Sequence, residues 1–328
     1  MTVNPRMALV GEIDGTEVRF AITDVEELTI TLFVALRCDM FPSLQAAIEA
    51  YLASIPYRPT MAGFAVAGPV TDGVVNLTNL PWSFTREELR AETGATHVHL
   101  LNDFEALALS LPYLGAHDLH RIGGGEPVDR ATKVVLGPGA GLGVAALAPS
   151  PGGWISLPGE GGHVSFAVKD AEELLLVEGI RKGKGHVSAE RLISAPGLEA
   201  IFRVLGETRG VDAKLSAGEI IERALAGEDR LAEDAVGYLA MWLGRFAGDM
   251  ALVYGARGGV YLAGSMAPNI FADQAGNASR AAAFNQAFQD KGRLASYLAP
   301  IPIYVVRSID AGLRGTAVAL SMRVPPGS

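Results

Sequence analysis

The sequence predicts an α/β protein with two lobes that face one cleft. Segments with strand-like and helix-like patterns alternate along the 328 residues, which is typical of the α/β class. Each half opens on the same plan, a strand, a glycine-containing turn and a second strand, at 8–23 and at 134–147. Hydrophobic residues make up 49% of the chain, which is enough apolar material for a folded core.

The first half begins with a predicted hairpin, because apolar segments at 8–14 and 17–23 are joined by an Asp-Gly pair. Ser43 and Thr85 each precede a segment with helical spacing, so we expect them to cap helices. The remaining elements expected in this half are strands at 28–35, 62–67, 74–77 and 97–101 and a helix at 104–111.

The second half is expected to be mainly helical after its opening strands. Residues 115–130 lack periodicity and predict a linker. The strongest helical pattern covers 236–251, and Ser188 predicts a further helix start with Glu190 in its first turn. Other elements expected here are strands at 134–136, 144–147, 259–263 and 302–306 and a helix at 310–320.

Charge and cysteine content exclude several classes of partner. The 27 basic and 36 acidic side chains give a net charge of −9, which opposes binding to nucleic acid or to an anionic membrane. Cys38 is the single cysteine, so a disulfide framework and a thiolate metal cluster are both excluded. The sequence shows no signal peptide and predicts a cytoplasmic protein without nucleic-acid or membrane partners.

Asn102 and Asp103 directly follow the strand expected at 97–101, and ligands of α/β sheets collect at the carboxyl ends of strands. There Asp103 is suited to act as a general base that takes a proton from a substrate hydroxyl. Asn102 is suited to orient the same substrate by hydrogen bonds. Both residues are also common helix N-caps, and local sequence leaves this alternative open.

The segment 157–163, with the sequence LPGEGGH, places a carboxylate and an imidazole three residues apart among glycines. Glu160 and His163 offer the hydrogen-bonding groups that a polyhydroxylated ligand needs, although a solvated surface loop is the alternative. A zinc site is not expected, because no third ligand lies at metal spacing. The glycine-rich turn at 137–143 offers backbone amides to phosphate, but it matches neither a P-loop nor a Rossmann motif.

Taken in order along the chain, these segments resemble those of bacterial glucokinases. The resemblance covers nearly the whole chain, and its most specific pieces are 157–163 and 186–191, which read LPGEGGH and HVSAER. It implies the two-lobed actin/hexokinase-like fold, which is ribonuclease H-like, with a central cleft. The lobes would be a small α/β lobe of 1–113 plus 304–328 and a large α/β lobe of 114–303.

The resemblance also implies an activity and a set of site residues. The activity is ATP-dependent phosphorylation of D-glucose at its 6-hydroxyl, with Mg²⁺ as cofactor and a homodimer as the assembly. Asp103 would be the catalytic base, and Asn102, Glu160, His163 and Glu190 would bind the sugar. The residues implied on the nucleotide side are Gly11, Glu12, Gly15, Thr16, Gly139, Ala140, Gly141 and Gly264, with Glu12 as the Mg²⁺ ligand.

The departures from the family pattern lie in the nucleotide half. Asp14 stands where a glycine is usual, Glu17 where an asparagine is usual, and Glu12 where a shorter aspartate is usual. Ala140 replaces a threonine and Ser265 a glycine. Added carboxylates near a polyanion are repulsive, by about 1 kcal/mol per close pair in water and more in a protein. The alternative hypothesis is therefore a glucose-binding protein of the same fold whose kinase activity is weak or lost.

Overall fold

The computed structural model describes residues 6–56, 58–68, 70, 73–77, 80–182, 185–272 and 277–323. The chain divides into two compact units. The first comprises Met1–Gly115, Trp154–Pro158 and Ser308–Ser328, and the second comprises Ala116–Gly153 and Gly159–Arg307. Strands and helices alternate in both, which confirms the predicted α/β class.

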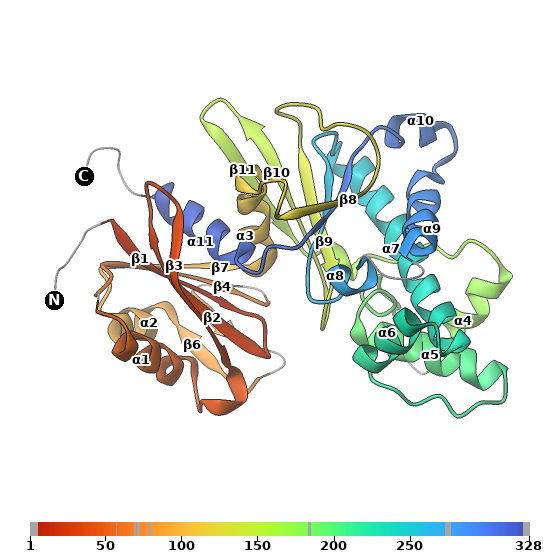
Figure 1. The fold of residues 1–328 in the computed structure, drawn as a ribbon, viewed down its shortest axis with the longest axis horizontal. Coiled ribbons are helices and arrows are strands. Elements are labelled where there is room, and N and C mark those ends of the chain that lie inside the picture. Colours follow the sequence, from red (N-terminus) through yellow and green to blue (C-terminus); the bar gives the residue numbers. More distant parts are fainter. Residues whose placement is uncertain are drawn as a thin grey trace. The chain divides into compact units, whose positions relative to one another are not determined.

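The first unit is built on a sheet with the strand order β3-β2-β1-β4-β7, in which β3 comprises Thr29–Arg37 (Figure 1). β1 (Met7–Ile13) pairs antiparallel with β2 (Glu17–Asp24), which confirms the hairpin predicted from the Asp-Gly pair. On its other side β1 runs parallel to β4 (Met61–Val66), and β4 runs parallel to β7 (His97–Asn102). The carboxyl ends of these parallel strands therefore lie at one edge of the sheet.

Helices cover both faces of this sheet. Leu9 and Ile13 of β1 pack with α1 (Leu44–Ser54) and α2 (Arg86–Thr93), whereas Ala8 and Val10 pack with α11 (Ala311–Ser321). The two predicted caps are confirmed. Ser43 accepts a hydrogen bond from the Ala46 amide at 3.3 Å, and Thr85 forms a capping box with Glu88. The sheet is thus buried on two sides, as parallel strands require.

α11 packs unusually closely against α3 (Asp103–Ser110), the helix that follows β7. A Cβ atom added to Gly315 would lie 1.7 Å from the backbone oxygen of Ala106. One at Gly312 would lie 2.5 Å from the carboxylate of Glu12 on β1. These glycines allow the last helix of the chain to lie directly on the elements that carry Glu12 and Asp103.

In the second unit, β10 (Leu142–Ser150), β9 (Lys133–Pro138), β12 (Val260–Leu262), β13 (Ile303–Val306) and β8 (Leu119–Gly123) are neighbours in that order. β8 lies within 115–130, so the linker predicted there is wrong in part. The strand pairs antiparallel with β13, far along the chain. β8 is stabilised as a strand by pairing with β13, and local periodicity does not reveal a partner so far along the chain.

Two helices of the second unit show one success and one error of the sequence analysis. α7 (Arg230–Tyr254) contains the predicted pattern at 236–251, and Trp242 and Leu243 are fully buried in its core. The helix start predicted at Ser188 is wrong, because α5 begins at Ala195 with Ser194 as its cap. The remaining elements are β5 (Val74–Asn76), β6 (Ser83–Thr85), β11 (Gly153–Gly159), α4 (Ala171–Arg181), α6 (Ala217–Ala226), α8 (Ala267–Ile270), α9 (Asn277–Gln289) and α10 (Ala295–Leu298).

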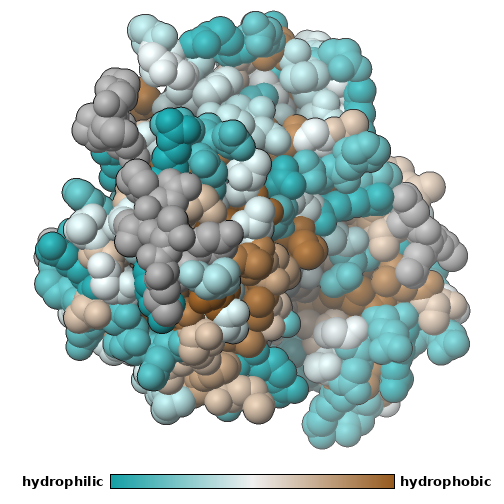
Figure 2. Space-filling view, turned by 60° about the vertical axis from the view of Figure 1, so that its left-hand side comes forward, coloured by the Kyte–Doolittle hydropathy of each residue, from teal (hydrophilic) through white to brown (hydrophobic). Residues whose placement is uncertain are grey.

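Among the described residues, no helix has the length and apolar character needed to cross a lipid bilayer. On the face drawn in Figure 2, hydrophilic residues surround a smaller group of hydrophobic ones.

The close contact of α11 with α3 predicts a strong effect of Gly315→Ala. The added methyl group cannot fit beside the Ala106 carbonyl, so we expect a loss of about 2 kcal/mol or more in the free energy of unfolding. Gly237→Ala is the matched control, since nothing lies within 4 Å of its added Cβ inside α7. This control should gain about 0.5–1 kcal/mol from helix propensity. Denaturant unfolding of both variants measures this difference, and equal stabilities would contradict it.

Candidate active site

Asp103 lies at the point where β7 ends and α3 begins. Asn102 caps the helix, since its Oδ1 accepts hydrogen bonds from the amides of Phe104 at 2.9 Å and Glu105 at 3.2 Å. Its Nδ2 donates to the Gly68 carbonyl at 3.3 Å. The structure thus supports the cap interpretation for Asn102, and this cap fixes Asp103 in the first turn of the helix.

The environment of Asp103 favours its protonated form. Burial, followed by the nearby charge of Glu12, raises the pKa of Asp103 to about 7, against an opposing hydrogen bond from the Phe104 amide. A carboxyl group that titrates near neutral pH is well matched to accept a proton from a hydroxyl. This is the strongest sign in the first unit of a group prepared for acid–base chemistry.

Glu12 is a buried carboxylate in the same unit, whereas Asp103 is partly buried. Burial raises the pKa of Glu12, while Arg19, with Nη1 3.4 Å from Oε2, opposes the rise. Asp310, just before α11, adds negative charge to its surroundings. Sequence analysis did not identify Asp310 or Gly312 as neighbours of Glu12, since both follow it by almost the whole chain and carry no local signal.

The turn between β1 and β2 is closed by its own carboxylate. Asp14 Oδ1 accepts hydrogen bonds from the Thr16 amide at 2.9 Å, the Thr16 hydroxyl at 2.8 Å and the Glu17 amide at 2.9 Å. Burial would raise the pKa of Asp14, but these hydrogen bonds and Arg19 together lower it. The donors expected to meet phosphate are therefore engaged within the loop.

Arg19 neutralises part of the acidic loop. Its Nη2 lies 3.0 Å from Asp14 Oδ2 and 3.3 Å from Glu17 Oε2, so both added carboxylates are ion-paired. We predicted that these carboxylates repel phosphate by their charge. The structure adds a second obstacle, because a phosphate group would compete with Asp14 for the same amides and the same guanidinium group.

Two glycines expected on the nucleotide side also have structural reasons to be glycine. Gly15 has a φ of 92°, in the region that side chains disfavour. A Cβ at Gly11 would lie 2.6 Å from the Phe64 ring. Their presence follows from the hairpin and its packing without reference to a ligand.

Three of the four predicted sugar-binding side chains belong to the second unit, where they lie close together. His163 Nε2 is 3.8 Å from Glu160 Oε2, and His163 Nδ1 is 3.9 Å from Glu190 Oε1. Glu160 and His163 are largely exposed, with 67% and 59% of their side chains accessible, and Glu190 is half-buried. An imidazole between two carboxylates presents several acceptors and a donor to solvent, which suits a ligand with several hydroxyl groups.

The glycine-rich turn before β10 lies beside the turn at Gly264. Gly139 and Ser265 are neighbours, since a Cβ at Gly139 would lie 3.3 Å from Ser265 Oγ. Gly264 has a φ of 80° and passes close to the Pro138 carbonyl. The Gly139 amide donates to the Gly141 carbonyl at 2.8 Å, so this amide is used inside the turn. The phosphate-binding role expected for Gly139, Ala140, Gly141 and Gly264 stays a prediction.

The donor set of the first unit suits Mg²⁺ only when the ion arrives with a ligand. Within the described part of the chain, no group of three or more His, Cys, Asp or Glu side chains is arranged to hold a metal. Mg²⁺ bound with a nucleotide commonly takes one or two carboxylates and completes its shell with phosphate and water. Glu12, a single buried carboxylate, fits this arrangement.

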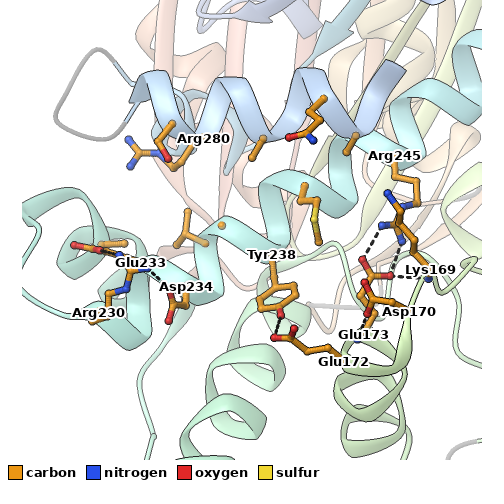
Figure 3. A pocket seen from close by; sticks show the side chains of 18 of the residues that line it. Lys169, Asp170, Glu172, Glu173, Arg230, Glu233, Asp234, Tyr238, Arg245 and Arg280 are labelled. Carbon is orange, nitrogen blue, oxygen red and sulfur yellow. Dashed lines mark hydrogen bonds and ion pairs between the residues drawn. The ribbon is translucent and has the colours of Figure 1, made fainter. Parts of the chain in front are cut away.

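A cavity of about 750 Å³ in the second unit is lined by charged groups of α4, α7 and α9 (Figure 3). Arg245 of α7 binds Glu173 of α4 with two hydrogen bonds, at 2.7 and 2.6 Å, and Tyr238 binds Glu172. None of Glu160, His163 and Glu190 is among the residues that line it. These pairs connect α4 to α7, and the cavity is separate from the predicted sugar-binding group.

Comparison with known proteins gives consistent results over the full chain. The family model described as Glucokinase matches residues 9–323. A protein named glucokinase from Ralstonia nicotianae is 39% identical over 343 residues, covering 100% of this chain and 98% of the relative. One from Tolumonas auensis is 38% identical over 318 residues, covering 96% and 97%.

Among solved structures, a glucokinase from an Antarctic psychrotroph superposes with a TM-score of 0.81 at 33% identity. The match covers 96% of this chain and 98% of that one. This likeness confirms the predicted actin/hexokinase-like α/β fold.

The raised pKa of Asp103 predicts a pH-dependent effect of Asp103→Asn on stability. The native carboxyl binds its proton more tightly than the unfolded one, so wild-type stability falls as pH rises from 3.8, the ordinary pKa of an aspartate, to about 7. The neutral amide removes this loss. The melting temperature of the variant relative to wild type should therefore rise from pH 4 to pH 7 and level off above it. A difference that is independent of pH would contradict the burial of the charge.

Proposed function

The chain belongs to the glucokinase family, and we propose how its own residues phosphorylate glucose. It is a hexokinase-type sugar kinase, and the family implies ATP as the phosphate donor. In the reaction the 6-hydroxyl oxygen forms a bond to the γ-phosphorus, the bond to the ADP oxygen breaks, and the hydroxyl proton leaves to a base. The observation that carries our assignment is the partly buried Asp103 carboxyl at the start of α3, with its pKa of about 7.

Asp103 is the base in this proposal. Its position is fixed by the Asn102 cap, and its raised pKa gives it a strong affinity for the hydroxyl proton at neutral pH. Catalysis of phosphoryl transfer depends mainly on positioning the reactants and stabilising charge. The orientation of the Asp103 carboxylate toward the hydroxyl is therefore the main requirement. The main role of Asn102 in this proposal is to hold Asp103 in place through the helix cap.

Glu160, His163 and Glu190 bind the sugar hydroxyls in this proposal. Family membership supports the assignment, and so does their grouping around His163 within 3.8 and 3.9 Å. Fixing several hydroxyls leaves the 6-hydroxyl in one orientation, which converts binding energy into a faster reaction. Because the side chains of Glu160 and His163 are largely exposed, their polar atoms are accessible to the ligand.

Glu12 is the Mg²⁺ ligand in this proposal, and Arg19 holds the Glu12 carboxylate on the sheet edge. Mg²⁺ bound with the triphosphate would neutralise charge that develops on the transferred phosphoryl group. The homodimer implied by the resemblance also remains a proposal, which sedimentation velocity of the purified protein tests.

A coupled assay for glucose 6-phosphate tests the role of Asp103. Asp103→Ala should lower kcat by about 10²–10⁴, the usual contribution of a general base. Glu105→Gln, two residues further along α3 and hydrogen-bonded to Ser156, is the matched control and should stay within about threefold of wild type. Unchanged turnover in Asp103→Ala would remove the assignment of the base.

The amides of Thr16 and Glu17 already donate hydrogen bonds to Asp14, and this observation favours weak nucleotide binding. Isothermal titration separates this from a failure of sugar binding. Heat from glucose without heat from Mg·ATP would support the alternative of a glucose-binding protein with weak or lost kinase activity. Heat from both ligands supports the enzyme.

The same loop predicts a gain from Asp14→Gly combined with Glu17→Asn. The change frees two amides and Arg19 for phosphate, so the KM for ATP should fall by about tenfold, as one hydrogen bond and one ion pair would give. Asp14→Asn keeps the acceptor oxygen without the charge and should give a smaller decrease. Steady-state kinetics at saturating glucose measure all three proteins, and an unchanged or higher KM would show that Asp14 is no obstacle.

A further inference from the structure

The two oxygens of the Glu190 carboxylate have different surroundings. Oε2 accepts a hydrogen bond from the backbone amide of Leu142 at 2.9 Å. Oε1 lies 3.9 Å from His163 Nδ1. One oxygen is therefore anchored to the backbone, and the other is directed to the group that we propose binds glucose.

Gly141, the residue before Leu142, makes this anchor possible. A Cβ atom added there would lie 2.5 Å from Glu190 Oε2 and 3.3 Å from its Cδ. Gly141 is absent from the glycines with positive φ, so the backbone conformation there does not itself require glycine. The space taken by the Glu190 carboxylate is the physical reason for a glycine at this position.

The segment that carries Glu190 is also fixed by its backbone. The Glu190 amide donates to the Gly162 carbonyl at 2.9 Å, and the Ala195 amide donates to the Gly139 carbonyl at 2.8 Å. A Cβ at Gly162 would lie 2.1 Å from the Leu142 oxygen, so the loop with His163 lies directly against the glycine-rich turn. Three segments distant in sequence are thereby joined around one carboxylate.

We propose that Gly141 and the Leu142 amide are positioning elements of the sugar site, which set the orientation of Glu190 for a hydroxyl-bearing ligand. The proposal rests on the glucose-binding role of Glu190 given above. It changes the expected role of Gly141, which the resemblance placed on the nucleotide side. With Oε2 held by an N–H donor, Oε1 accepts a hydrogen bond from a hydroxyl group of the ligand, and the orientation of the carboxylate is set before the ligand binds.

Titration of glucose into Gly141→Ala in the absence of nucleotide tests this role. The methyl group displaces the carboxylate, so the Kd for glucose should rise at least about tenfold. The KM for ATP at saturating glucose should change less than about threefold, because the effect is on the sugar side. Gly152→Ala, in the turn after β10 with nothing within 4 Å of its added Cβ, is the matched control and should keep the Kd for glucose within about twofold. A raised KM for ATP with an unchanged Kd for glucose would overturn the proposal.

A double-mutant cycle shows whether Gly141 acts through Glu190. Glu190→Ala removes the carboxylate and leaves room for the new methyl group. Adding Gly141→Ala to Glu190→Ala should therefore leave the Kd for glucose unchanged. Any decrease in melting temperature that Gly141→Ala causes in wild type should be absent when the same change is made in Glu190→Ala. A further loss of glucose affinity in that background would overturn the proposal.

The cycle also separates this proposal from the proposed function. Wild type that binds no glucose, or Glu190→Ala that binds it as tightly as wild type, would contradict the sugar-binding role of Glu190 and the positioning role with it. If Glu190→Ala raises the Kd for glucose and Gly141→Ala leaves it unchanged, only the positioning role is contradicted.

Discussion

The placement of the Asp103 carboxylate beside the buried Glu12 carboxylate, where parallel strands of the first sheet end, is the interaction on which the proposed chemistry depends. Glu12 lies on β1 and Asp103 directly follows β7, and both strands run parallel to β4, so their carboxyl ends come to the same end of the sheet. Burial and the neighbouring charge move the pKa of Asp103 to about 7, where it can exchange a proton with a hydroxyl. α11 completes this environment, and its Gly312 and Gly315 permit the required close approach.

Backbone hydrogen bonds fix polar side chains in both units. In the second unit, the Leu142 amide holds the Glu190 carboxylate, and the Gly162 carbonyl holds the segment that carries it. In the first unit the same kind of bond holds Asp14, whose carboxylate accepts hydrogen bonds from the Thr16 and Glu17 amides that we expect a phosphate group to require. The same type of hydrogen bond, from a backbone amide to a carboxylate, therefore supports the predicted sugar site at Glu190 and opposes the predicted phosphate site at Asp14.

Local signals predicted most of the elements but not the contacts that shape the sites. The hairpin at Asp14–Gly15 and the caps Ser43 and Thr85 are encoded within a few residues, and the structure confirms them. β8 and the true start of α5 were missed, because the strand depends on a distant partner and Ser194 supplies a better cap than Ser188. Gly141 and Gly312 are required by side chains far along the chain, which a single sequence does not show. Which of the predicted site residues touch a ligand is likewise a question of distant contacts, so those roles remain predictions.

A crystal structure with bound glucose tests the central claim most directly. The account predicts that the 6-hydroxyl lies within hydrogen-bonding distance of the Asp103 carboxylate, with Glu160, His163 and Glu190 on the other hydroxyls of the same ring. A sugar ring bound elsewhere, or an Asp103 carboxylate turned away from that hydroxyl, would contradict it.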